Sequence, residues 1–275
     1  MQSPREHVEA IDIAVILSVP VVLAAVHLLP DTVRGALVLN YVSPGVVQVY
    51  TTHFVHADFA HLAGNIGVYL VAVALGYLLL VYADARRTFY AGFALVLLVV
   101  PFPVSALDLY LLGPRVGDSS TRGFSGLASA FVGFLPVAVF VFLRANLTEK
   151  VRVYESMGLF LASLGVILLI IRGPTDLTGL GAFALGVLYY APVLRRVEAD
   201  DRRAFAGWSI LKQALVIYTV LFFLVSPVIL FPAEPAQGDT VVNLVAHFGG
   251  FFLGYIGGIV SNASIISVWS RSSNT

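Results

Sequence analysis

Long apolar runs separated by short charged segments dominate the sequence. Each run is long enough, at roughly 17–25 residues, for a helix to cross about 30 Å of hydrocarbon. None of them alternates polar and apolar positions with a period of two, as the strands of a membrane barrel do. The pattern predicts an all-α, polytopic membrane protein, a single transmembrane domain over residues 1–275. Its eight predicted spans lie near 12–29, 60–82, 89–112, 124–143, 156–172, 177–194, 209–231 and 241–261.

Composition supports a lipid environment. The chain is 59% hydrophobic and 12% charged, with a mean hydropathy of +0.91, whereas soluble domains carry about 25% charged residues. The 16 basic and 16 acidic residues cancel, so we expect the lipid bilayer as a partner and no nucleic acid, which would require a basic surplus. The absence of cysteine excludes disulfides, thiolate metal sites and cysteine nucleophiles.

The charges between the runs predict the direction of the chain. With the N-terminus inside, the inner segments hold 12 of the 16 basic residues, which is the bias of an N-in, C-in protein. The runs 156–172 and 177–194 are short and share a Gly173-Pro174 corner. They form either two spans or one re-entrant hairpin, and the topology of the other spans is the same in both cases.

The second run begins with two polar residues. His61 and Asn65 are four residues apart, so a helix presents both on one face, about 5–6 Å apart at Cβ. We interpret the pair either as a polar bridge between helices or as two hydrogen-bond donors to one ligand. His53 and His56 raise a metal hypothesis, but no carboxylate or thiolate completes a zinc set. We therefore expect no metal and no cofactor.

The fourth run begins with Gly123-Phe124-Ser125-Gly126. A serine at a helix N-terminus lies among backbone N–H groups that have no partner within the helix and can stabilise a developing oxyanion. The alternative is a helix cap flanked by glycines that serve only helix packing.

His247 lies in the outer third of the last run, beside a row of small residues spaced four apart. Such rows allow two helices to approach closely, and a similar row lies on the fourth run. We therefore expect these two helices to pack together and bring His247 near Ser125. The alternative is a buried histidine that only hydrogen-bonds within the core. The two rows are Ala246, Gly250, Gly254 and Gly258, and Ser125, Ser129 and Gly133.

The predicted topology joins these residues. The second, fourth and last runs all pass from outside to inside, and His61, Ser125 and His247 lie near their outer ends, so all three share one membrane depth. Nucleophilic catalysis needs a hydroxyl, a base within reach and donors for the oxyanion. Ser125, His247 and the pair His61 and Asn65 supply one of each.

The three motifs are His-x-x-x-Asn at 61–65, Gly-x-Ser-Gly at 123–126 and Ala-His-x-x-Gly-x-x-x-Gly at 246–254. In order and placement they resemble those of the rhomboid family of intramembrane serine proteases. The stretch 51–62 also resembles that family's entry into its second helix. The resemblance covers the first four spans, the last and one between. It implies a rhomboid-like six-helix core with about two extra transmembrane helices.

The resemblance also implies a mechanism. Ser125 would be the nucleophile and His247 the general base of a Ser-His dyad. His61 and Asn65 would bind the oxyanion together with the backbone N–H of Ser125. The implied activity is that of a serine-type endopeptidase hydrolysing peptide bonds in or near transmembrane segments, with transmembrane proteins as substrates.

Two departures from the family pattern support a second interpretation. Ser129 stands where the family often has a tyrosine that packs on the catalytic histidine. His247 is then either held by another aromatic, such as Phe248 or Phe251, or less well oriented. Val47-Gln48 stands near the place of the family's Trp-Arg pair. The alternative is a rhomboid-like protein that binds membrane clients without cutting them, and a small transporter or channel is a third interpretation.

Localisation follows from the spans and the composition. The eight spans predict a multi-pass membrane protein, and the absence of cysteine and the compact length indicate a prokaryotic cell membrane. Nothing in the sequence specifies an oligomeric state.

Overall fold

The computed structural model describes residues 8–234, 236–237 and 240–272. Within them, eight helical segments are long and apolar enough to cross a membrane, so the predicted all-α, multi-pass architecture is confirmed. The segment bounds differ from the predicted ones by at most three residues. The segments are Ala10–His27, Phe59–Val81, Arg86–Leu111, Ser125–Asn146, Val153–Arg172, Leu177–Arg196, Ile210–Leu230 and Leu244–Ala263.

Continuous helices form five of these segments, and two shorter helical pieces form each of the other three. The continuous ones are α1 (Ala10–His27), α4 (Phe59–Val81), α8 (Ser125–Asn146), α13 (Ile210–Leu230) and α14 (Leu244–Ser272). The divided ones are α5 (Arg86–Leu98) with α6 (Pro101–Leu111), the 3-10 helix Val153–Ser156 with α9 (Met157–Arg172), and α10 (Leu177–Leu188) with α11 (Ala191–Arg196).

Pro101 accounts for the break in the third span. Proline has no backbone N–H and its ring crowds the preceding turn, so it favours the first turn of a helix over the interior. Here it is the first residue of α6. Helix α5 therefore ends at Leu98, and α6 begins after two intervening residues, still within one apolar segment.

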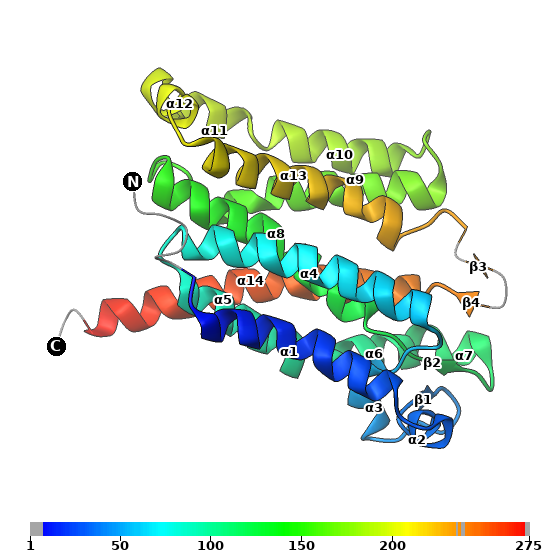
Figure 1. Ribbon diagram of the computed structural model, residues 1–275. Helices are drawn as coiled ribbons and strands as arrows, with labels where there is room; N and C mark the ends of the chain where they lie inside the picture. Colours follow the sequence, from blue (N-terminus) through cyan, green and yellow to red (C-terminus); the bar gives the residue numbers. More distant parts are fainter. Residues whose placement is uncertain (1–7, 235, 238–239, 273–275) are drawn as a thin grey trace.

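Helix α8 is the centre of the bundle. Of its most apolar stretch, 94% is buried inside the protein, against 17% for the segment Leu177–Arg196. It packs most extensively against α14 and α4, and also against α13 and α5 (Figure 1). Helix α10, by contrast, packs mainly against α9, at the edge of the bundle. The fifth and sixth predicted spans thus form two antiparallel helical segments, each long and apolar enough to cross a membrane.

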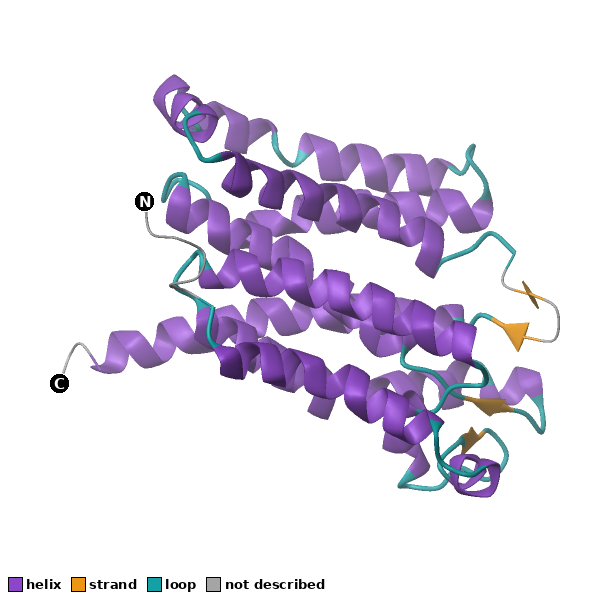
Figure 2. Ribbon diagram, in the orientation of Figure 1, coloured by secondary structure: helices purple, strands orange, loops and turns teal. Residues whose placement is uncertain are grey.

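Short elements gather at one end of the bundle (Figure 2). They are α2 (Asp31–Ala36), β1 (Leu39–Asn40), α3 (Gln48–Thr51), the 3-10 helix Thr52–Phe54, α7 (Gly113–Val116), β2 (Ser120–Thr121), β3 (Ala236–Gln237) and β4 (Thr240–Val241). Strand β1 pairs antiparallel with β2, and β3 with β4. Helix α12 (Ala199–Ala206) lies at the opposite end, beside α11. The first end is the one at which α4, α8 and α14 begin.

Candidate functional site

The site is built where three helices start side by side. Helices α4, α8 and α14 run in the same direction, so their first turns lie at the same end of the bundle (Figure 1). His61 and Asn65 lie in the first two turns of α4, Ser125 is the first residue of α8, and His247 lies in the first turn of α14. The shared depth predicted for these residues is therefore present in the fold.

Glycines bring α8 and α14 into backbone contact. A Cβ atom added at Gly250 would overlap the backbone of Gly126, and one added at Gly254 would overlap that of Ala130. The row predicted on α14 therefore faces α8. On α8, however, the contacts fall on Gly126 and Ala130, one residue after the predicted Ser125 and Ser129. Gly133 does belong to the contact, because a Cβ there would overlap the backbone of α14.

His247 is held in a defined tautomer. Its Nδ1 hydrogen-bonds the backbone carbonyl of Leu230, at the end of α13. A carbonyl only accepts, so Nδ1 carries the proton of the neutral ring and Nε2 is left as an acceptor. The ring of Phe231 packs edge-on against the imidazole, with centroids 6.0 Å apart. An aromatic other than a tyrosine at position 129 thus packs on His247, as expected, but it is Phe231 rather than Phe248 or Phe251: Phe251 contacts Phe231, and Phe248 is exposed.

Ser125 is half-buried at the N-terminus of α8. Its backbone carbonyl accepts a hydrogen bond from Ser129 Oγ at 2.8 Å. In the described part of the chain its own hydroxyl has no hydrogen-bond partner. Ser125 and His247 therefore lie on two helices in contact, but no hydrogen bond joins their side chains. Catalytic hydrogen bonds are often long before substrate binds.

His61 and Asn65 lie against the turn that precedes Ser125. Asp58 caps α4 by accepting from the backbone N of His61 at 2.8 Å, which places His61 in the first turn. Gly123 has a φ of +132°, which glycine adopts without strain. A Cβ at Gly123 would lie 2.8 Å from Cε1 of His61 and 3.9 Å from Nδ2 of Asn65. Glycine therefore leaves room for the His61 ring, while Asn65 would remain at ordinary contact distance.

His56 orients the Asn65 side chain, a role that the sequence did not suggest. Its Nε2 lies 2.9 Å from Asn65 Nδ2 and 3.3 Å from the backbone N of Phe124. Because a backbone N–H only donates, Nε2 is the acceptor, and Asn65 must present its NH₂ group to it. One of the two Asn65 N–H bonds is then occupied, and the other is available to a ligand.

Two histidines of the loop before α4 stay neutral. Burial, with smaller contributions from neighbouring His61 and His27, lowers the pKa of His56 to about 3. Burial also lowers the pKa of His53 to about 4, and its Nε2 lies 3.0 Å from the Pro101 carbonyl. At neutral pH the acceptor role of His56 is therefore permanent.

The segment before Ser125 is fixed to the same loop by backbone and side-chain bonds. The Gly123 backbone N donates to the Thr52 carbonyl at 3.1 Å, and the Thr52 hydroxyl bonds the Thr121 carbonyl. Leu39 of β1 pairs with Thr121 of β2 and donates its N–H to Thr52 Oγ1. The starts of α4 and α8 are thus joined by bonds as well as by packing.

Asn243 fixes the start of α14. Its Oδ1 accepts from the backbone N of Ala246 at 2.9 Å, as a helix cap does. Its Nδ2 lies 2.6 Å from Oδ2 of Asp108 in α6 and 3.2 Å from Thr121 Oγ1. The buried carboxyl of Asp108 therefore anchors the turn that contains His247. Asn243 lies three residues before the last predicted motif, and no pattern in the sequence marks it.

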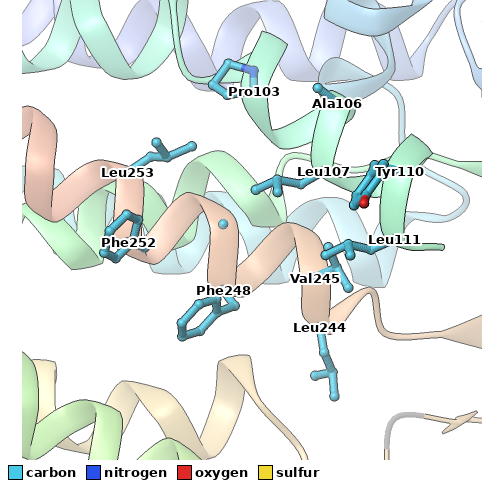
Figure 3. A pocket seen from close by; sticks show the side chains of 11 residues that line it. Pro103, Ala106, Leu107, Tyr110, Leu111, Leu244, Val245, Phe248, Phe252 and Leu253 are labelled. Carbon is cyan, nitrogen blue, oxygen red and sulfur yellow. The ribbon is translucent and has the colours of Figure 1, made fainter.

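An apolar groove of about 780 Å³ lies beside the site, between α6 and α14 (Figure 3). Phe248, Gly249 and Phe252 line it from α14, and Leu107 and Tyr110 from α6. None of Ser125, His247, His61 and Asn65 lines it. Both walls belong to membrane-spanning segments, so hydrocarbon is the matching occupant, and the groove adds no polar group to the site.

Neither a metal site nor a similar protein adds to this description. Among the described residues, no group of three or more histidine, aspartate or glutamate side chains is placed to hold a metal ion. Comparison with protein-family models, with curated proteins and with solved structures found no match. The function must therefore be inferred from the arrangement of the site residues themselves.

Proposed function

We propose that this protein is an intramembrane serine endopeptidase of the rhomboid type, which hydrolyses peptide bonds in or near the transmembrane segments of membrane proteins. The orientation of His247 carries the proposal. Its Nδ1 is tied to the Leu230 carbonyl, so Nε2 is an acceptor. Its helix touches, through glycine, the helix that Ser125 begins. A general base needs this tautomer.

The reaction follows from these groups. Ser125 Oγ attacks the carbonyl carbon of the scissile bond, and its proton passes to Nε2 of His247. The oxyanion of the tetrahedral intermediate accepts from the Ser125 backbone N–H, from the free Asn65 N–H and from His61. Collapse breaks the C–N bond as His247 returns the proton to the leaving amine. Water then hydrolyses the acyl-enzyme with His247 again as the base.

In this proposal α1, α4, α5 with α6, α8, α13 and α14 form a six-helix core, and the spans Val153–Arg172 and Leu177–Arg196 are the extra pair. Two observations support the division: α13 packs against both α4 and α8 and supplies the carbonyl that holds His247, whereas α10 packs mainly on α9. By the positive-inside rule the arginine-rich end would lie inside. The proposal therefore puts the site near the outer surface, and the proposed membrane is that of a prokaryotic cell.

A non-proteolytic protein that binds membrane clients is the second candidate. The observation that favours it is the Ser125 hydroxyl, which has no hydrogen bond to His247 in the described structure. A transporter or channel has less support, because His56 already binds one Asn65 N–H within the protein.

Labelling of the purified full-length protein with a fluorophosphonate probe tests the proposal. We expect labelling of the wild type and a loss of at least about 10³-fold in rate for Ser125→Ala and His247→Ala, because each removes half of the dyad. Ser226→Ala is the matched control, since among the described residues the hydroxyl of this buried serine bonds only the Phe223 carbonyl of its own helix. It should label as the wild type does.

The same variants separate the two candidates. Cleavage of a transmembrane substrate that disappears with Ser125→Ala establishes the protease. Equal, background labelling of wild type and Ser125→Ala, beside an active serine protease that labels in the same detergent, would contradict it and favour client binding.

A further inference from the structure

A second cavity, of about 490 Å³, lies at the opposite end of the bundle, where the 3-10 helix Val153–Ser156 meets α10 and α11 (Figure 1, near α11). Its polar lining consists of Arg152, Tyr154, Glu155, Tyr189 and Arg196. These residues belong to the two spans that are not needed for the Ser125 site, and the proposed function assigns them nothing.

The two arginines of this cavity differ in their partners. Arg196 forms an ion pair with Glu155, a residue that is 1% exposed, so these two charges cancel. Arg152 donates to the Tyr154 hydroxyl and lies 5.7 Å from the centre of its ring. Within the described residues, no carboxylate lies at ion-pair distance from the Arg152 guanidinium. The cavity therefore has one uncompensated positive charge.

The cavity is amphipathic and lies at membrane-surface level. Leu188, Pro192 and Val193 supply the apolar part of the lining. Tyr154 and Tyr189 are of the type that concentrates at the boundary between hydrocarbon and headgroups. Both spans that form the cavity reach their arginine-bearing ends here, Arg152 just before one and Arg196 at the end of the other. A ligand that fits must be anionic at one end and apolar at the other.

We infer that this cavity binds the phosphate-bearing headgroup of an anionic phospholipid. The phosphate contacts the Arg152 guanidinium, whose planar donors match phosphate oxygens, and the first part of the acyl chains lies on the wall of Leu188 and Val193. Basic pockets between transmembrane helices on the inner side are suited to such headgroups. The inference is independent of the proposed protease activity.

The test measures the unfolding temperature of the full-length protein in a neutral detergent during titration with three probes. These are phosphatidylglycerol, phosphatidylcholine and inorganic phosphate. We expect phosphatidylglycerol alone to stabilise the wild type, because binding to the folded state raises the unfolding temperature. Arg152→Gln should raise the half-saturating concentration of phosphatidylglycerol about fivefold. Arg152→Lys, which keeps the positive charge, should bring it back most of the way to the wild-type value.

Arg144→Gln is the matched control. It removes the same charge at the same end, from the exposed last turn of α8 outside the cavity, and should bind as the wild type does. Equal weakening by Arg144→Gln and Arg152→Gln would mean general attraction to the surface and would overturn the site. So would the absence of any stabilisation by phosphatidylglycerol. Equal stabilisation by inorganic phosphate would assign the cavity to free phosphate and overturn the lipid assignment.

Discussion

Two buried polar clusters lie at opposite ends of the bundle and are built differently. At the end that carries the N-terminus, the carboxylate of Asp12 in α1 is fully buried. Its Oδ2 accepts from the Tyr77 hydroxyl and its Oδ1 from the Tyr90 hydroxyl, while Arg86 Nη2 lies 3.6 Å from Oδ2. Every oxygen of this carboxylate is engaged, and the bonds join α1 to α4 and α5.

The cluster at the other end keeps hydrogen-bonding capacity unused. Within the described residues, the Ser125 hydroxyl, Nε2 of His247 and one N–H of Asn65 have no partner in the protein, although Asn65 and His247 are buried. None of these three groups is a fully buried atom without a partner, so each can be reached by a ligand, whereas the oxygens of Asp12 are all bonded within the protein. Under the proposed function, the first cluster stabilises the fold and the second binds the substrate.

The largest expected effect that separates the clusters comes from Asn65. We expect Asn65→Ala to lower the rate of the proposed cleavage by about 10²–10³, the usual loss when one oxyanion donor is removed, with unchanged fluorescence-detected folding. Asn146→Ala is the matched control: Asn146 lies at the far end of α8 and bonds the carbonyls of Tyr82 and Phe142. A full rate in Asn65→Ala would remove this residue from the reaction and end the contrast between the clusters.

Asp12→Ala should do the reverse. It leaves the hydroxyls of Tyr77 and Tyr90 without their acceptor and removes the anion beside Arg86, so we expect the free energy of unfolding to fall by about 3 kcal/mol. The rate per folded molecule should stay at the wild-type value, because the site lies at the other end of the bundle. Unfolding and initial rates are measured on the same preparation, well below the unfolding temperature of the variant. A stable Asp12→Ala protein with a lost rate would contradict both assignments.

The sequence predicts the spans and the cluster around Ser125 for a physical reason. Spans follow from the length of apolar runs, which is a local property. His61, Asn65, Ser125 and His247 could be brought together because topology alone sets their depth. The row on α8 was misplaced by one residue, since regular spacing defines stripes on a helix but not which of two adjacent stripes meets the partner.

Other parts of the site depend on tertiary contacts that no local pattern contains. The Leu230 carbonyl that sets the tautomer of His247 is a backbone group and leaves no mark in the residue type. Asn243 and Asp108 are 135 positions apart. His56 and Phe124 are 68 apart, so His56 could be noticed as a histidine but not as the residue that orients Asn65.

The smallest expected effect is a pH dependence of the free energy of unfolding that comes from two histidines in the loop beside the site. His53 and His56 have folded-state pKa values of about 4 and about 3, below the value near 6.5 of an unfolded histidine. Below about pH 6.5 the unfolded chain therefore binds more protons than the folded one, and stability falls as pH falls. Two such groups should cost about 2.5 kcal/mol in total between pH 7 and pH 5.5.

Unfolding measured across this range in wild type, His53→Gln and His56→Gln checks the assignment. Each single variant should lose about half of the acid-induced destabilisation, because each removes one of the two protons taken up on unfolding. In His56→Gln the rate of the proposed cleavage should fall as well, since the acceptor that orients the Asn65 amide is replaced, whereas His53→Gln should affect stability alone. If His56→Gln had the pH profile of the wild type, His56 would not contribute to the loss of stability between pH 7 and pH 5.5. Its imidazole would then not be the buried acceptor between Asn65 and Phe124.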